Sequence, residues 1–99
     1  MSDEKIEIEN INTPGKTSRV DRAKYLAMRQ ALLAVLPATP PGMTVPQAKE
    51  ALLEHLPEDL FPGGSTAGWW LKAVQLDLEA KGIIERAPVK PVHLYRVGS

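Results

Sequence analysis

Two segments rich in proline and glycine limit what this chain can fold into: PATPPG at residues 37–42 and PEDLFPGG at residues 57–64. Proline lacks the backbone N–H that an interior helical turn needs, so neither segment can continue a helix. They separate three stretches with helical periodicity. Because 99 residues are too few for two ordinary domains, we predict one small, mainly helical domain.

The three predicted helices have clear boundaries. The first covers residues 18–36, is capped by Thr17 or Ser18, and buries an apolar stripe at 3-4-3 spacing: Tyr25, Met28, Leu32 and Val35. The second opens with Thr44 and Gln47, the spacing of a capping box, and stops at Pro57. The third follows Ser65 or Thr66 and runs to Lys81, where Gly82 ends it because glycine accepts a left-handed backbone.

The remaining segments favour short β-structure and core contacts. IEIENI at residues 6–11 alternates apolar and polar side chains, as in a half-buried strand or an arm laid across a surface. IIER and VHLYRV, joined by APVKP, predict a C-terminal hairpin. Leu60 and Phe61 in the second connector are expected to insert into the core.

This order of helix, helix, helix and hairpin resembles a winged helix-turn-helix domain. The resemblance is carried by TVPQAKEALLEHL at residues 44–56 and AVQLDLEAKGIIER at residues 73–86. It implies a mainly α fold with a small β-hairpin, divided into an N-terminal arm (1–16) and a winged-helix-like domain (17–99). The phrases PGKTSRVDRAKY and LPEDLFPGGSTAGWWLKAVQLDLEAKG also resemble a family of short bacterial proteins of unassigned function.

The third helix has two apolar sides. At about 100° per residue, Leu71, Val74 and Leu78 share the core face with Trp70 at its edge. The opposite side holds a second apolar stripe: Trp69, Ala73, Leu76 and Ala80. In winged-helix regulators that side enters the major groove, where base contacts need polar side chains. Asp77 and Glu79 are assigned to the helix surface, where they would repel phosphates.

Three explanations of this second stripe stay open. The N-terminal arm, or Leu60 and Phe61, could pack over Trp69 and Leu76 and close the stripe internally. The stripe could be a homodimer seam or a partner groove, since exposed apolar patches mark interaction sites. Trp69 could also contact thymine methyl groups or sugars of DNA.

A nucleic-acid interpretation rests on basic residues. Residues near the start of the first helix and in the hairpin could hold phosphates. The candidates are Lys16, Arg19, Arg22, Lys72, Arg86, Lys90 and Arg96. The chain as a whole carries 12 basic and 12 acidic residues, so bulk charge does not favour nucleic acid.

Catalytic and metal chemistry find no support in the sequence. It has no cysteine, and its two histidines, His55 and His93, have no second ligand at metal spacing. No Ser, His and Asp arrangement suggests a triad, and no apolar run is long enough to cross a bilayer. We therefore expect a cytoplasmic protein that is not an enzyme, with no metal, cofactor, membrane or small-molecule substrate.

The sequence thus predicts a non-catalytic winged-helix-type module that binds a protein partner, or itself, through Trp69, Ala73, Leu76 and Ala80. The alternative is a small DNA-binding transcriptional regulator that contacts phosphates through its first helix and its wing.

Overall fold

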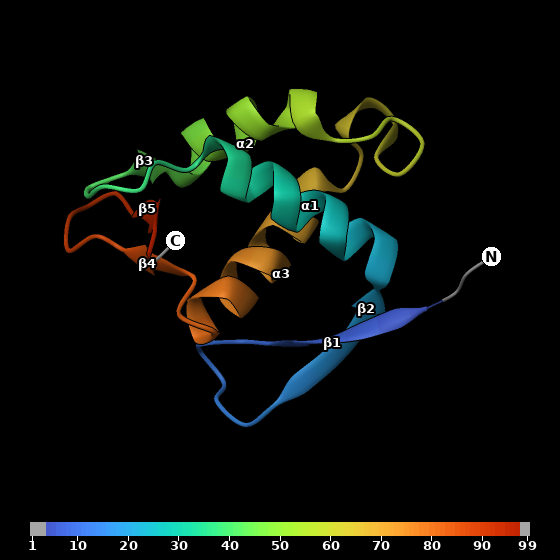
Figure 1. Ribbon diagram of the computed structural model, residues 1–99, viewed down its shortest axis with the longest axis horizontal. Helices are drawn as coiled ribbons and strands as arrows, with labels where there is room; N and C mark the ends of the chain where they lie inside the picture. Colours follow the sequence, from blue (N-terminus) through green and yellow to red (C-terminus); the bar gives the residue numbers. More distant parts are fainter. Residues whose placement is uncertain (1–3, 98–99) are drawn as a thin grey trace.

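Three helices stack around one core in the computed structural model, which describes residues 4–97 (Figure 1). Two small antiparallel sheets complete the α/β arrangement. The elements are β1 (Lys5–Glu9), β2 (Thr17–Asp21), α1 (Arg22–Val35), β3 (Met43–Thr44), α2 (Val45–Leu52), α3 (Ala67–Ala80), β4 (Ile84–Arg86) and β5 (His93–Arg96). Short 3-10 turns follow α2 at Leu53–His55 and precede α3 at Pro62–Gly64.

The core forms where the predicted buried faces of the first and third helices meet the second helix. Met28 and Leu32 from α1, Ala48 and Leu52 from α2, and Val74 and Leu78 from α3 are fully buried. Phe61 inserts from the connector, as predicted, and its ring lies edge-on to Trp70 with 6.4 Å between centroids. These contacts confirm which face of each helix is buried.

Local signals placed several helix ends correctly. The Gln47 N–H donates to Thr44 Oγ1 at 3.2 Å, and the Thr44 N–H donates to Gln47 Oε1 at 3.0 Å, so the predicted capping box is present. Gly82 has φ of 75° and follows Lys81, the cap residue of α3, as expected of a helix-ending glycine. Thr66 precedes α3 but makes no side-chain cap hydrogen bond.

The start of the first helix was predicted wrongly. Residues Thr17–Asp21 form β2, which pairs antiparallel with β1 so that Ile6 lies opposite Val20. The helix begins at Arg22, and Asp21 is its cap, accepting a hydrogen bond from the Lys24 N–H at 2.9 Å. A boundary between residues 16 and 17 would therefore divide a hairpin. Val20 and Ile8 are buried together, which favours the strand over another helical turn.

The second sheet holds the predicted hairpin and an additional strand. Its order is β3-β5-β4, with Met43 opposite Leu94. Gly42 makes this approach sterically accessible, since a Cβ there would lie 1.9 Å from the Leu94 carbonyl oxygen. The hairpin is thereby fixed to the segment that enters α2. None of the helices within residues 4–97 is long and apolar enough to span a membrane.

Candidate binding groove beside Trp69

The N-terminal hairpin packs against α3 through β1 and covers part of its second apolar stripe (Figure 1). Leu76 is only 7% exposed, and Ala73 and Ala80 are partly covered. Trp69 remains 60% exposed. Of the three explanations left open for this stripe, cover by the N-terminal segment therefore applies to Leu76, whereas Trp69 stays exposed.

A buried carboxylate attaches this hairpin to the helices. Asp77 is fully buried on α3, so its assignment to the helix surface was wrong. Its Oδ2 accepts a hydrogen bond of 2.5 Å from the Tyr25 hydroxyl of α1, and its Oδ1 accepts from the Glu9 N–H at 2.8 Å. Lys81 Nζ lies 2.6 Å from Oδ1. One side chain thus joins β1, α1 and α3. Burial, and then the hydrogen bond to Asp77, raise the pKa of Tyr25.

A second acidic residue of α3 is also engaged internally. Glu79 is buried, contrary to its predicted surface position. It accepts hydrogen bonds from Gln75 Nε2 at 2.8 Å and from Arg86 Nε at 2.7 Å. Gln75 and the Nε group of Arg86 therefore belong to an intramolecular network beside α3.

A groove of about 550 Å³ separates β2 from α3. Ile8, Val20 and Leu76 provide buried apolar groups along it. Trp69 borders the groove and packs edge-on against Trp70, with 5.1 Å between ring centroids. Because Trp70 is itself only 8% exposed and touches Phe61, the exposed indole rests on an aromatic stack that reaches the core.

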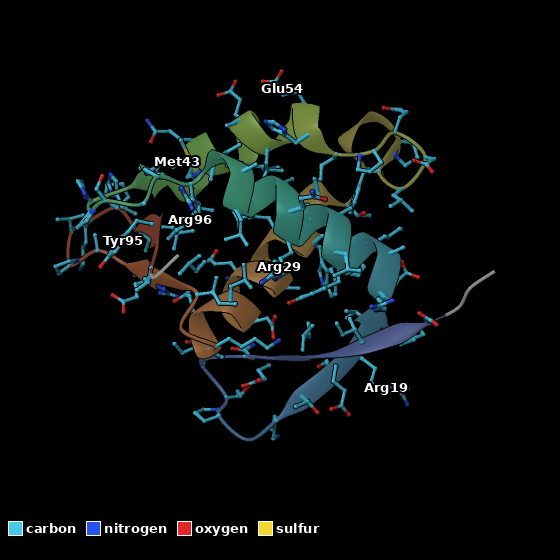
Figure 2. The ribbon with its side chains drawn as sticks, in the orientation of Figure 1. Arg19, Arg29, Met43, Glu54, Tyr95 and Arg96 are labelled. Atoms are coloured by element: carbon cyan, nitrogen blue, oxygen red, sulfur yellow. The ribbon has the colours of Figure 1, made fainter. Side chains whose placement is uncertain are left out.

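The groove has more basic than acidic side chains. Lys16, Arg19 and Lys72 line it, against Glu9 alone. All four are exposed, and Arg19 projects from β2 at the end of the molecule opposite α2 (Figure 2). This excess of positive charge would attract an acidic ligand.

A second groove, of about 620 Å³, lies on the other side of Lys72 between α2, α3 and β4. Lys49, Lys72 and Arg86 line it together with apolar groups such as Val45 and Leu71. Lys49 was missed in the sequence, where it follows the core residue Ala48 and looks like an ordinary solvent-facing position. No local pattern indicates that it approaches α3.

The other candidate nucleic-acid residues lie elsewhere. Arg22 forms an exposed ion pair with Glu4 at 3.2 Å. Arg96 Nε donates to the Leu36 carbonyl at 2.9 Å, so this side chain caps the end of α1 (Figure 2). Lys90 is exposed in the loop between β4 and β5. The predicted set is therefore divided among separate places, with Lys16, Arg19 and Lys72 gathered at the Trp69 groove.

Comparison with known protein families finds a match over most of the chain. Residues 5–94 match a family of unknown function, DUF6958. The chain belongs to this family. The match includes both strands of the N-terminal hairpin, α3 and every residue that lines the Trp69 groove. No curated protein and no solved structure matches the chain. Within the described residues, no three His, Asp or Glu side chains are grouped as metal ligands.

Proposed function

We propose that this protein is a non-catalytic, winged-helix-type module that binds a protein partner in the groove between β2 and α3. The winged-helix assignment is supported by the order α1, α2, α3 and C-terminal hairpin. It is further supported by β3, which joins the hairpin sheet and holds it against the helices. Fold alone does not define function, so the proposal rests on the groove.

The exposure of Trp69 carries the proposal. Tryptophan buries roughly 150–250 Å² when fully covered and is enriched among residues that dominate binding energy. Covering the 60% that is exposed would contribute about 3 kcal/mol, at about 25 cal/mol per Å². The stack on Trp70 also limits the conformational entropy that the indole would lose on binding.

A protein partner fits α3 better than duplex DNA does. Direct base contacts need free donors and acceptors on the outward side of the helix, but Gln75 is buried and hydrogen-bonded to Glu79. The outward part of α3 near its start offers an indole and the single base Lys72. DNA binding stays the second candidate, supported by the presence of Lys49, Lys72 and Arg86 around the second groove. If the protein binds DNA, these three side chains would contact phosphates without selecting a base sequence.

Site-specific photo-crosslinking tests the proposal. Benzoylphenylalanine replaces Trp69 in one variant and Leu26 in a control, and each is irradiated in cells that produce the protein naturally. Leu26 is 41% exposed on α1 and lies away from both grooves, so it reports chance encounters. We expect discrete protein adducts from position 69 alone. Nucleic-acid adducts at position 69, or the same adducts from both positions, would refute the proposed site.

A further inference from the structure

We propose that the partner contributes an extended acidic segment, which adds to the outer edge of β2 as a third strand of the N-terminal sheet. This inference rests on the proposed function and specifies the ligand of the same groove. An added strand gains affinity from main-chain hydrogen bonds and specificity from its alternating side chains.

The outer edge of β2 has unpaired backbone groups. The first sheet consists of β1 and β2 alone, so among residues 4–97 no strand lies on the far side of β2. The Arg22 N–H donates to the Glu4 carbonyl at 3.0 Å, and hydrogen-bonded and non-hydrogen-bonded pairs alternate along an antiparallel ladder. The pairs Glu7–Arg19 and Glu9–Thr17 are therefore of the second kind. Their N–H and C=O groups point away from the partner strand.

One of these outward-pointing groups already has a hydrogen-bond partner, which supports the direction assigned to them. The Glu9 N–H points away from β2 and donates to Asp77. The equivalent groups of Thr17 and Arg19 point from the opposite edge of the sheet. An edge of this kind is a template for another strand.

The groove is lined by residues of that edge. Residues 17–20 border it consecutively, although successive side chains of a strand point to opposite faces. Thr17 and Arg19, whose N–H and C=O groups point outward, are among these residues, and Ile8, Glu9 and Asn10 line the groove as well. Trp69, Ala73 and Leu76 of α3 form its other side. A segment lying here would have β2 beside it and the apolar surface of α3 beneath it.

The sequence of β1, which pairs with one edge of β2, indicates which side chains a strand on the other edge should carry. β1 has the sequence KIEIE, with Ile6 and Ile8 turned toward the core and Glu7 opposite Arg19. A strand added to the outer edge of β2 would likewise have an apolar surface on one side and basic side chains on the other. Its inward side chains would lie on Trp69 and Leu76 of α3, and its outward ones beside Arg19, while Lys16 and Lys72 add positive charge around the groove. Alternating apolar and acidic residues satisfy both surfaces.

The test uses a fluorescein-labelled peptide of sequence Glu-Val-Glu-Val-Glu-Val and the full chain, with binding measured by fluorescence anisotropy. We expect binding that is at least tenfold weaker for Trp69→Ala, and unchanged for the matched surface substitution Leu26→Ala. The counterpart Lys-Val-Lys-Val-Lys-Val should bind at least tenfold more weakly. Equal binding of the acidic and basic peptides would overturn the charge assignment.

Two N-methylated peptides test strand addition itself. Backbone N–H groups alternate direction along a strand, so methylating all valine amides blocks one edge and methylating all glutamate amides blocks the other. We expect one methylated peptide to bind like the parent and the other to lose at least tenfold in affinity. A loss with both peptides, or with neither, would overturn strand addition.

Further outcomes separate this inference from the proposed function. If position 69 crosslinks to protein but the acidic peptide does not bind, the acidic-strand inference fails and the groove remains a protein site. Salt-sensitive displacement of the peptide by a dT12 oligonucleotide would assign the groove to nucleic acid. It would overturn both the acidic-strand inference and the proposed protein-binding function. A dimer that the peptide dissociates would assign it to a second copy of this chain and overturn the acidic-partner assignment.

Discussion

Replacing Asp77 with asparagine should loosen the N-terminal hairpin and lower the stability of the whole domain. Asparagine keeps the size and shape of the side chain but removes its charge. In place of one carboxylate oxygen it presents an NH2 group to the donors that surround it: the Tyr25 hydroxyl, the Glu9 N–H and the Lys81 ammonium. The amide oxygen can still accept from the Glu9 N–H and Lys81, but the NH2 group can only donate to the Tyr25 oxygen, so the charge opposite Lys81 and the bond donated by Tyr25 are both lost.

The expected loss is about 2–4 kcal/mol. A hydrogen bond to a charged group contributes roughly 1.5–3 kcal/mol, and Asp77 accepts two that Asn weakens or loses, from the Tyr25 hydroxyl and the Glu9 N–H. Asp77→Asn retains one acceptor oxygen, so the loss falls at the lower end of these values. At roughly 4–8 °C per kcal/mol for a domain of this size, the Tm should fall by about 8–30 °C.

Urea unfolding, followed by circular dichroism and by tryptophan emission, measures this loss. Asp59→Asn is the matched control because Asp59 is exposed in the connector before α3, and it should change stability by less than about 0.5 kcal/mol. Amide exchange should locate the damage, with the Glu9 N–H losing protection in the Asp77 variant. A free energy of unfolding within about 1 kcal/mol of the unsubstituted chain would refute the view that Asp77 attaches the hairpin.

Three further predictions concern alkali, steric fit and fluorescence. The pKa of Tyr25 is raised above its usual 10.0, so its contribution to stability is complete below about pH 10. Above that pH the unfolding free energy should fall by about 1.4 kcal/mol per pH unit, and Tyr25→Phe should flatten the slope in urea titrations. Gly42→Ala should lower the unfolding free energy by at least about 2 kcal/mol in the same titration, because the added Cβ would lie 1.9 Å from the Leu94 carbonyl oxygen. Gly15→Ala is the control: its Cβ meets open space, so only the positive φ should cost, about 1 kcal/mol. Equal losses for the two variants would contradict this account. Trp70→Phe should leave red-shifted emission from exposed Trp69, and a blue-shifted spectrum would mean that something covers it.

The sequence predicted the features that depend on neighbouring residues. Thr44 and Gln47 are three positions apart, so their capping box could be recognised without knowledge of the fold. The burial of Leu71, Val74 and Leu78 follows from helical periodicity. Gly82 ended the third helix as expected, because the conformation it supplies is a local requirement.

The features that build the candidate site depend on contacts between distant residues. Thr17–Asp21 resembles the capped start of a helix, and only its pairing with Lys5–Glu9 makes it a strand. Asp77 resembles a surface residue because its partners Glu9 and Tyr25 lie 68 and 52 positions away. The two apolar sides of α3 were recognised, but which residues the hairpin would cover depended on a strand that the sequence had not revealed.

Amide exchange along β2 tests the central claim most directly, that the groove between β2 and α3 is a binding site for an extended segment. The Thr17 and Arg19 N–H groups point away from β1 and should exchange rapidly in the free protein. Adding the Glu-Val peptide should protect both amides and shift the indole N–H resonance of Trp69, while the exposed Val89 amide region stays unchanged. Binding without protection at Thr17 and Arg19 would contradict the account.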